Sequence, residues 1–443
     1  MCEWDEFEAR EAFVRARLAD PDGELLPPFL LLSEPGVTAG EQRACSDLWM
    51  RKRLAAATPD RDLLAFRHAA AAPKKIRLGY LSNDFHDHAT ALLLVEVLEA
   101  QDRGLFELYA YSYGADDGKA MRPRLRRAFD HFRDIGRLSD VEAARAIHAD
   151  GVHILIDLKG FTRQTRTSIL ALRPAPLQVN YLGYPGTLGV DLCDYIVTDA
   201  FVTPRASAAD FAESFAYLPH CYQPRGRLGA IGLAPSRAEV GLPEEGFVYC
   251  CFNQAFKFTP AVFDVWCRLL DAVPGSVLWL LAAREAEGNL RNEARQRGVD
   301  GRRLVFAPDV TQARHLGRLQ LADLVLDTAP YGAHTTASDA LWAGTLLVTR
   351  PGATFPSRVA GSLLHAAGLP ELIVEDSEDY FDLALALATD PARYAALRRK
   401  LADNSASAPL FDVTAYTLAL ESLFRAMWAR YQAGLPNAAI QAS

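Results

Sequence analysis

The sequence has no apolar run long enough to span a bilayer. Its first residues, Met-Cys-Glu-Trp-Asp-Glu-Phe-Glu, are acidic and lack the basic and apolar regions of a signal peptide. The seven cysteines include no Cys-x-x-Cys pair, and Cys250 and Cys251 are adjacent. An odd, unpatterned set of cysteines is typical of reduced, buried thiols. These absences predict a cytoplasmic protein that has no membrane partner.

The composition indicates a folded chain. Half of the 443 residues are hydrophobic and 23% are charged, which is typical of a globular protein and excludes a disordered one. The length is enough for two or three domains with real cores. A net charge of -8 argues against nucleic acid as the main partner.

Little in the sequence would hold a metal ion. His86-Asp-His88 follows a predicted strand, but no third ligand stands at ligand spacing, so a hydrogen-bonded loop histidine is the simpler interpretation. Asp-x-Asp occurs only in the helical N-terminal part, as Asp20-Pro-Asp22 and Asp60-Arg-Asp62, where we expect it to be chemically idle. The sequence therefore predicts no metal site.

Strands and helices alternate after a helical opening, residues 1–72, that prolines interrupt. This alternation predicts a doubly wound, mostly parallel α/β sheet. Strands are expected at 74–82, 106–112, 152–158, 177–182 and 195–198, and helices at 90–100, 121–132 and 141–148.

A Gly/Pro/Arg-rich passage, residues 219–243, then interrupts the pattern and indicates an interdomain linker. The alternation begins again after it. Strands are expected at 247–252, 276–281, 304–306, 324–326, 346–348 and 372–374, and helices at 260–272, 285–297, 312–321 and 378–433, with a break at 405–409. The pattern predicts two Rossmann-like lobes with a ligand cleft at the carboxyl ends of their strands.

One stretch, residues 321–344, is typical of an anion site. An apolar strand leads through a Pro/Gly loop to His334-Thr-Thr336, and Thr335 or Thr336 would cap the following helix. A strand, a small-residue loop and a helix N-terminus together favour phosphate. Asp339, one turn into the helix, could reach a ribose diol. The alternative is a capped helix without a ligand.

Other polar groups follow predicted strands. The Gly183-Tyr-Pro-Gly-Thr187 segment is typical of a tight turn that lets the backbone approach a ligand. Lys257 could neutralise a diphosphate, although a lone lysine at such a position is more often simply solvated. His315 and Arg318 lie one turn apart, where the histidine could stack on a nucleobase or face solvent. His153 lies in an apolar segment typical of a core histidine.

Five motifs in order make the chain resemble, from about residue 74 to 434, the catalytic region of O-linked N-acetylglucosamine transferases and their Spindly-like relatives, glycosyltransferase family 41. The motifs are Gly79-Tyr-Leu-Ser-Asn-Asp-Phe-His-Asp-His88, Gly151-Val-His-Ile-Leu-Ile-Asp-Leu158, Leu172-Arg-Pro-Ala-Pro-Leu-Gln178 with Leu182-Gly-Tyr-Pro-Gly-Thr187, Phe252-Asn-Gln-Ala-Phe-Lys257, and Leu326-Asp-Thr328 with His334-Thr-Thr336 and Asp339-Ala-Leu-Trp-Ala-Gly344. The helical opening resembles the connector that follows the tetratricopeptide repeats in this family, and no repeats are seen here.

The resemblance implies a GT-B fold and four segments: a connector (1–72), an N-terminal Rossmann-like lobe on the acceptor side (73–225), a C-terminal nucleotide-sugar lobe (226–400) and closing helices that pack back across the lobes (401–443). It implies inverting transfer to protein Ser or Thr hydroxyls without a metal or other cofactor. The implied site comprises His88, His153 and Lys257 as catalytic residues, and Gln254, His315, Arg318, His334, Thr335, Thr336, Asp339, Gly183, Tyr184, Pro185, Gly186 and Thr187 around the nucleotide sugar.

Within this site, Lys257, Thr335 and Thr336 would hold the diphosphate, with Gln254 beside it. His315 would stack on the base near Arg318, and Asp339 would bind the ribose. His88 and His153 would flank the sugar and the acceptor. The acceptor hydroxyl needs a proton acceptor; His88 is the candidate, and a donor phosphate oxygen or a water relay are the alternatives.

Two positions leave the donor open. Gln312 stands where animal members have a lysine that touches the nucleoside, and Tyr331 is bulkier than the animal residue near the sugar. UDP-N-acetylglucosamine is the default donor, and GDP-fucose or another activated sugar is the alternative. A nucleotide-sugar epimerase or hydrolase on the same fold, or a non-catalytic binding module, are the other functions that these residues allow.

Overall fold

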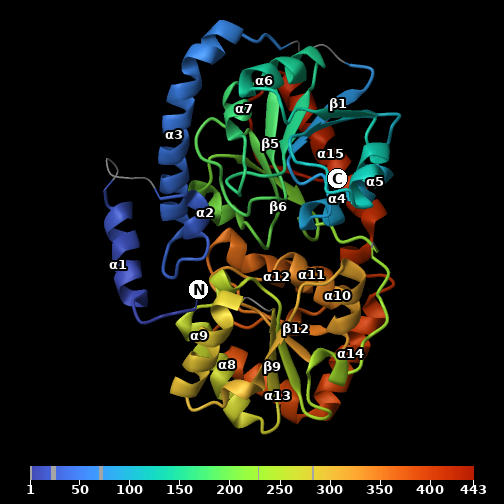
Figure 1. Cartoon of the computed structure of the whole chain (residues 1–443). Helices are drawn as coiled ribbons and strands as arrows, with labels where there is room; N and C mark the ends of the chain where they lie inside the picture. Colours follow the sequence, from blue (N-terminus) through green and yellow to red (C-terminus); the bar gives the residue numbers. More distant parts are fainter. Residues whose placement is uncertain (1, 21–25, 69–72, 228, 282–283) are drawn as a thin grey trace. The chain divides into compact units, whose positions relative to one another are not determined.

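In a computed structural model of the chain, residues 2–20, 26–68, 73–227, 229–281 and 284–443 are described. They form two compact units, each with a parallel sheet and flanking helices (Figure 1), as the α/β prediction requires. The unit whose sheet comes first along the chain, here called the N-unit, comprises Arg17–Leu31, Val37–Gly226 and Asp412–Ser443. The other, the C-unit, comprises Met1–Ala16, Leu32–Gly36 and Arg227–Phe411. The division into four segments, 1–72, 73–225, 226–400 and 401–443, stays a prediction. Residue 72, the end of the first segment, and Asp22 of the first Asp-x-Asp lie outside the described residues.

The N-unit sheet has eight strands in the order β13-β7-β6-β5-β4-β1-β2-β3, and every neighbouring pair is parallel. Chain order reverses at β1, so the loops after β1 and β4 leave the sheet side by side in opposite directions. The strands are β1 (Ile76–Ser82), β2 (Phe106–Ser112), β3 (His131–Asp134), β4 (Ile154–Asp157), β5 (Leu177–Asn180), β6 (Tyr195–Asp199), β7 (Ser214–Leu218) and β13 (Ile440–Gln441).

The C-unit sheet has five parallel strands in the order β10-β9-β8-β11-β12. Here the order reverses at β8, which places the loops after β8 and β11 next to each other. The strands are β8 (Val248–Cys251), β9 (Val277–Leu281), β10 (Leu304–Ala307), β11 (Leu324–Leu326) and β12 (Leu346–Val348). Most of their residues are buried, as continuous apolar runs in a parallel sheet should be.

The helices cover the sheets and form the N-terminal part of the chain. A capping box between Thr38 and Glu41 starts the long helix α3. Helix α15 packs on α4 and β7 within the N-unit. The helices are α1 (Phe7–Leu18), α2 (Pro28–Leu31), α3 (Ala39–Leu64), α4 (Ala89–Ala100), α5 (Met121–Ala128), α6 (Asp140–Ala149), α7 (Thr167–Ala171), α8 (Pro260–Ala272), α9 (Arg284–Gln296), α10 (Gln312–Leu319), α11 (Thr335–Trp342), α12 (Phe355–Ala366), α13 (Ser377–Thr389), α14 (Pro391–Asn404) and α15 (Val413–Gln432).

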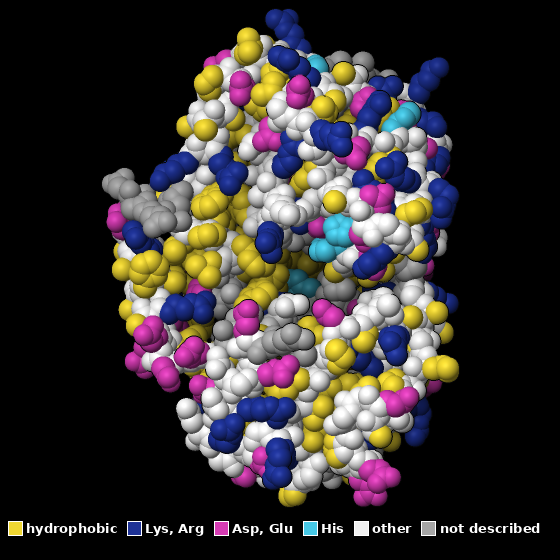
Figure 2. All heavy atoms as spheres, viewed as in Figure 1, with side chains coloured by type: hydrophobic (Ala, Val, Ile, Leu, Met, Phe, Trp, Pro, Cys, Tyr) yellow, Lys and Arg dark blue, Asp and Glu magenta, His cyan; other side chains and the backbone are white. Residues whose placement is uncertain are grey.

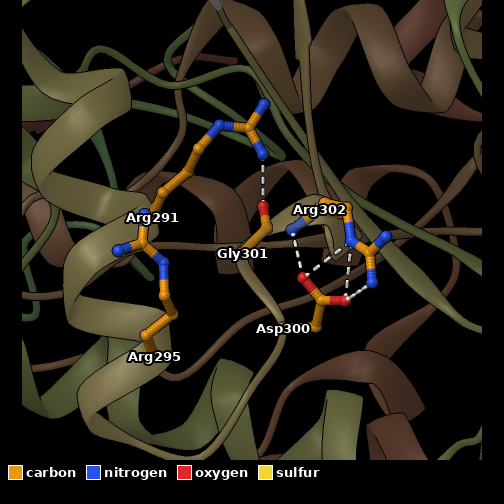
Figure 3. A pocket seen from close by; sticks show the side chains of 5 residues that line it. All are labelled: Arg291, Arg295, Asp300, Gly301 and Arg302. Carbon is orange, nitrogen blue, oxygen red and sulfur yellow. Dashed lines mark hydrogen bonds and ion pairs between the residues drawn. The ribbon is translucent and has the colours of Figure 1, made fainter.

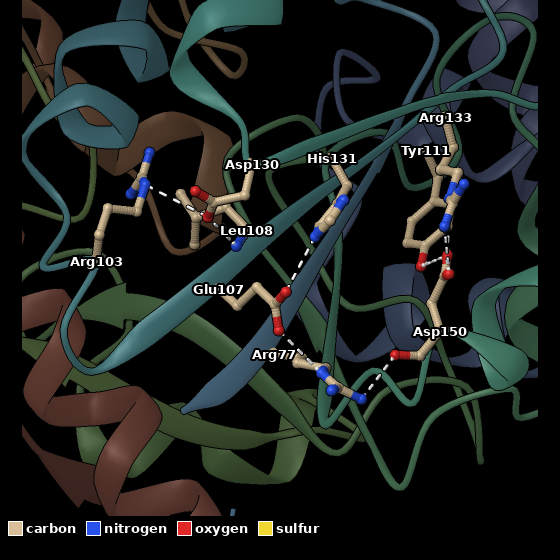
Figure 4. Close-up of polar contacts among 9 residues, drawn as sticks. All are labelled: Arg77, Arg103, Glu107, Leu108, Tyr111, Asp130, His131, Arg133 and Asp150. Carbon is tan, nitrogen blue, oxygen red and sulfur yellow. Dashed lines mark hydrogen bonds and ion pairs between the residues drawn. The ribbon is translucent and has the colours of Figure 1, made fainter. Parts of the chain in front are cut away.

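The predicted helix 121–132 is wrong in its last turn, because β3 begins at His131 and pairs with β2. Contacts from the neighbouring strand β2 and from the end of α6 hold this edge segment (Figure 4). His131 Nε2 lies 3.0 Å from Glu107 Oε1, and the His131 ring stacks on Tyr109. Arg133 pairs with Asp150 at 2.6 Å. The contacts of His131 with Glu107 and Tyr109 are cross-strand pairs, which stabilise a strand against its local helical preference.

Other differences from the sequence pattern occur at sheet edges. The predicted strand 372–374 is a single bridge between Thr349 and Ile373, since a 3-10 turn at Pro370–Leu372 ends just before it. The edge strand β13, its neighbour β7 and the short helix α7 were not predicted. Edge strands contribute few residues and little periodicity, so a local pattern identifies them poorly.

Candidate active site

The side chain of Lys257 lies at the reversal of strand order in the C-unit. It follows β8 in the 3-10 turn Ala255–Lys257, and its Nζ donates to the carbonyl oxygen of Gly332 at 2.8 Å. The ammonium also lies 3.8 Å from the centroid of the Tyr331 ring. Lys257 therefore joins the loop after β8 to the loop between β11 and α11, where a parallel sheet of this kind binds ligands.

The charge of this buried lysine depends on Asp327, the residue after β11. Burial lowers the pKa of Lys257 to about 8, and the Asp327 carboxylate opposes the shift. Asp327 itself accepts from the amides of Thr328 and Ala333 at 2.7 and 2.6 Å. A lysine held this way keeps a poorly hydrated positive charge, which binds an anion more strongly than an exposed one would.

Asn253 connects the same loop to the start of α11. Its Oδ1 accepts from the Thr336 hydroxyl at 2.5 Å, and its Nδ2 donates to the Thr328 hydroxyl at 2.8 Å. The prediction that Thr335 or Thr336 caps α11 is wrong, because the N-cap is His334 and the two threonines are the first two helical residues. Their backbone N–H groups still belong to the helix N-terminus, where anions bind.

His334 and Tyr331 pack at the same helix start. The His334 Nε2 lies 3.1 Å from the carbonyl oxygen of Pro356, and the ring lies 5.1 Å from that of Tyr331. Burial, with Lys257 nearby, lowers the pKa of His334 to about 3, so the ring is neutral. Tyr331 is 8% exposed. Its ring therefore packs against the cationic side chain.

A second group of predicted residues lies on α10 and α11. His315 Nδ1 accepts from Arg318 at 3.0 Å, and both side chains pack against the Phe252 ring. Burial lowers the pKa of His315 to about 4, so its ring is uncharged and suited to stacking. The Asp339 carboxylate accepts from Gln312 at 3.0 Å and lies 4.0 Å from His315.

Asn253, His315 and Thr336 line one small pocket. Its lining comes from β8 and the residues after it, from α10, from β11 and from the start of α11, and comprises Cys250, Cys251, Phe252, Asn253, His315, Leu319, Val325 and Thr336. The structure thus brings together Lys257, Thr336, His315 and Asp339 around the loops after β8 and β11. Gln254 is exposed at the N-cap of the 3-10 turn, and no hydrogen bond from its side chain caps that turn.

In the N-unit, the loops after β1 and β4 meet through a buried ion pair. Lys159 Nζ lies 2.9 and 3.1 Å from the two carboxylate oxygens of Asp84, and both side chains are only 7% exposed. His88 Nδ1 lies 3.5 Å from Asp84 Oδ2, and the His88 side chain is 43% exposed. Burial lowers the pKa of His88, and Lys159 and His86 lower it further, while Asp84 raises it.

The Gly183–Thr187 turn lies after β5 at the same end of this sheet. A Cβ on Gly183 would lie 1.7 Å from the Leu158 carbonyl oxygen, so only glycine fits there. Thr187 donates to the buried carboxylate of Glu213 at 2.6 Å, and Asn180 donates to the Gly186 carbonyl at 2.8 Å. Tyr184 is 3% exposed, and Pro185 lies between these anchored residues.

The structure does not bring His153 together with His88. His153 directly precedes β4, whereas His88 follows β1, and parallel strands place these two positions at opposite ends of the sheet. His153 Nδ1 accepts from the Arg77 amide at 2.8 Å, and its ring packs edge-on against Trp428. Burial lowers its pKa to about 4. We therefore assign His153 a structural role and leave it out of the proposed site.

Four residues of these clusters were not predicted as site residues. Asp84, Lys159, Asn253 and Asp327 each follow a strand that borders a reversal of strand order. All four lie inside or next to the motifs quoted above. Their position in the sequence could have identified them, since a polar residue just after a buried strand faces the ligand-binding edge of a parallel sheet.

A pocket of different character lies at the start of β10, away from the carboxyl ends of the C-unit strands. It is lined by Arg291, Arg295, Asp300, Gly301 and Arg302 (Figure 3). Asp300 pairs with Arg302 at 2.7 Å, which lowers the pKa of the carboxyl to about 2, and Arg291 donates to the Gly301 carbonyl. The visible face in Figure 2 shows acidic and basic side chains intermixed.

The described residues contain neither a metal-binding cluster nor a membrane-spanning helix. Among the described residues, no group of three or more His, Cys, Asp or Glu side chains could hold a metal ion. No helix in the part of the chain that the structure describes is long and apolar enough to cross a membrane.

The sequence profile of glycosyl transferase family 41 matches residues 59–224 and 230–420. The chain belongs to glycosyltransferase family 41. A probable UDP-N-acetylglucosamine–peptide N-acetylglucosaminyltransferase, SEC of Arabidopsis thaliana, is 37% identical over 82% of the chain and 39% of the plant protein. The Petunia hybrida protein SPINDLY, with the same probable activity in its name, is 31% identical over 81% of the chain and 39% of its own length.

The UDP-N-acetylglucosamine–peptide N-acetylglucosaminyltransferase of Caenorhabditis elegans is 29% identical over 98% of the chain and 48% of its own length. The chain thus spans less than half of these relatives. Among solved structures, a mutant of the Thermobaculum terrenum O-GlcNAc transferase superimposes with a TM-score of 0.81 at 31% identity, covering 91% of the chain and 76% of that protein. This similarity and the two parallel sheets confirm the predicted GT-B class.

Proposed function

We propose that this family 41 chain is an inverting glycosyltransferase that moves N-acetylglucosamine from UDP-N-acetylglucosamine to Ser or Thr hydroxyls of proteins. The names of its relatives support the donor and the peptide acceptor. The observation that carries the proposal is the position of Lys257, buried at the reversal of strand order and bonded to the loop that leads into α11.

The chemistry follows from this arrangement. Transfer breaks the bond between the sugar and a diphosphate, so negative charge develops on the leaving oxygen. Lys257 and the N-terminal amides at Thr335 and Thr336 would stabilise this charge without a metal ion, and preorganised groups of this kind are usually the largest catalytic term. Gln254, exposed beside Lys257, would lie near the same phosphates.

The nucleoside would bind beside the phosphates. We assign the base to the neutral His315 ring, with Arg318 fixing that ring and Asp339 offering a carboxylate to the ribose. Gln312 already donates to Asp339, so Gln312 would help to orient the carboxylate that holds the ribose. In the N-unit, His88 and the Gly183–Thr187 turn would border the sugar and the acceptor.

Two measurements test the proposal. Thermal unfolding with UDP, GDP and CMP, and with their sugars, should show stabilisation by UDP and UDP-N-acetylglucosamine; a ligand at a hundredfold excess over Kd adds about 2.7 kcal/mol. Incubation with the stabilising sugar nucleotide and a peptide library should then add one hexosamine mass to a Ser or Thr. Stabilisation by GDP-fucose alone would change the donor, and release of free sugar without modified peptide would contradict the transferase.

A further inference from the structure

A chain of hydrogen bonds runs through the hydroxyl of Tyr416, which lies in the first turn of α15. Tyr416 is the donor to the carbonyl oxygen of Tyr222 at 2.5 Å, because a carbonyl can only accept. Its oxygen also lies 2.5 Å from the hydroxyl of Tyr181, so Tyr181 is the donor in that contact. Burial raises the pKa of both hydroxyls, and both keep their protons at neutral pH. The direction is therefore fixed, from Tyr181 through Tyr416 to Tyr222.

Tyr181 leads into the turn of the candidate site. It follows β5, its side chain is fully buried, and its carbonyl oxygen accepts from the Gly183 amide at 2.9 Å. Between these two residues, Leu182 has a φ of +72°, a left-handed conformation that residues other than glycine rarely adopt. Such a conformation persists only where the surrounding contacts hold it. The anchored Tyr181 side chain is one of these contacts, at the entry into the Gly183–Thr187 turn.

The other two tyrosines lie beside the places where the polypeptide passes from one unit to the other. The polypeptide leaves the N-unit after Gly226 and returns to it at Asp412. Tyr222 lies shortly before the first crossing, and Tyr416 lies shortly after the second. Their hydrogen bond therefore ties the two chain crossings to each other within the N-unit.

We propose that Tyr416 is a positioning residue that acts through Tyr181 and couples both chain crossings to the turn beside the sugar and the acceptor. A displacement of either crossing then reaches the turn through two hydrogen bonds. The inference rests on the proposed function in one respect, that the Gly183–Thr187 turn borders the substrates. The coupling itself is measurable without turnover.

The two hydroxyls differ in what their removal does. Tyr181→Phe removes the donor at the start of the chain and leaves the bond from Tyr416 to Tyr222 in place. Tyr416→Phe removes both the acceptor of the buried Tyr181 hydroxyl and the donor to Tyr222, so it breaks the chain on both sides. The first variant therefore releases the turn alone, and the second releases the turn and the crossings.

Hydrogen exchange of the full chain tests this difference. Tyr181→Phe should raise the exchange rate of amides in residues 181–187 and leave that of residues 219–227 unchanged. Tyr416→Phe should raise the rate in both segments, by about fivefold or more. Wild-type exchange of residues 181–187 in folded Tyr416→Phe, or a rise in 219–227 with Tyr181→Phe, would overturn the proposal.

A control and a second variant accompany these measurements. Tyr111→Phe is the matched control, because Tyr111 is also fully buried in the N-unit and its hydroxyl donates to Asp150 at 2.9 Å, in β2 rather than beside the turn. It should leave exchange in both segments at the wild-type rate. If Tyr416→Phe does not fold, the double variant with Tyr181→Phe leaves no unpaired hydroxyl, and the same rise in both segments is expected.

Kinetics separate a positioning role from a general loss of stability. Tyr181→Phe and Tyr416→Phe should each lower kcat for peptide transfer by about fivefold or more, because the turn no longer holds the sugar and the acceptor in place. The Kd of UDP should stay at the wild-type value, since the residues assigned to the nucleotide belong to the C-unit. The double variant should be no slower than Tyr416→Phe, as one break already interrupts the chain.

The outcomes distinguish the inference from the proposed function. Additive losses in the double variant, or an unchanged kcat in folded Tyr416→Phe, would overturn the role of Tyr416. A wild-type chain that transfers no sugar to any peptide would contradict the proposed function, and hydrogen exchange would still decide whether the crossings and the turn are coupled.

Discussion

Lys257 donates to the carbonyl oxygen of Gly332 at 2.8 Å, which ties the loop after β8 to the loop after β11. In the N-unit, Lys159 and Asp84 join the loops after β4 and β1 in the corresponding way. Each sheet therefore has a buried lysine and a carboxylate where its strand order reverses. A buried charge is costly unless paired, so its presence at these two points indicates function more than stability.

Replacement of the C-unit lysine should remove catalysis without unfolding the protein. Lys257→Met is expected to lower kcat/KM for transfer roughly 10²–10³-fold, because it removes a preorganised cation at the leaving group. Lys400→Met is the matched control: Lys400 pairs with Glu371 on the surface of the same unit, and its loss should leave kcat/KM unchanged. Circular dichroism and Tm of both variants show whether the fold is kept. Near-wild-type turnover in folded Lys257→Met would contradict its role.

Donor affinity should depend on pH through the same side chain. The pKa of Lys257 is lowered to about 8, so the side chain is charged below this pH and loses its proton above it. Binding of the diphosphate above that pH must take up a proton, and Kd should rise by up to about tenfold per pH unit. Titrations between about pH 7 and 9, where the phosphates keep their charge, measure the effect. A Kd that rises equally in Lys257→Met would assign the dependence to another group.

The bridge through Asn253 should matter for both stability and donor binding. Asn253→Ala removes the acceptor of the half-buried Thr336 hydroxyl and the donor to the buried Thr328 hydroxyl, which keeps its own bond to the Tyr331 carbonyl oxygen. The variant is expected to cost about 1–3 kcal/mol of unfolding free energy. Thr336→Ser keeps the hydroxyl and should retain most of the stability, whereas Thr336→Val should lose it. Chemical denaturation with the same m-value in all variants checks this. Equal stability of the Ser and Val variants would mean that the bond to Asn253 contributes nothing.

The tight turn after β5 allows no side chain at its first residue. Gly183→Ala would place Cβ 1.7 Å from the Leu158 carbonyl oxygen, a backbone atom, so the turn must shift and Tm should fall strongly. Gly288 in helix α9 is the matched control, because no atom lies within 4 Å of its Cβ position. Gly288→Ala should stabilise by up to about 1 kcal/mol, since alanine favours a helix. Similar Tm values for the two variants would contradict this packing.

The sequence predicted the regular interior of both sheets well and their edges poorly. Continuous apolar runs fixed β11 and β12 at their observed bounds, and Pro260 at the first turn fixed α8. By contrast, β3 is held by contacts from Glu107 and Asp150 that no local pattern contains. Structure that depends on neighbouring strands cannot be recovered from periodicity alone.

The site shows the same division between motif and contact. Lys257, His315 and Asp339 were identified from their motifs, and the structure places them around adjoining loops. The hydrogen-bond partner of Thr336 is Asn253, whereas its neighbour Gln254 was predicted. Adjacent residues in a loop point in different directions, and no spacing rule decides which one faces the helix. His88 was the candidate base, and its contact with the Thr90 amide at the start of α4 appears only in the structure.

The central claim is that Lys257 and the start of α11 hold the donor diphosphate, and calorimetric titration of UDP and of uridine tests it most directly. UDP should bind folded Lys257→Met at least roughly tenfold more weakly than wild type, equivalent to 1.4 kcal/mol or more. Uridine lacks the phosphates and should bind both proteins equally. An unchanged affinity for UDP, or an equal loss for UDP and uridine, would contradict the account.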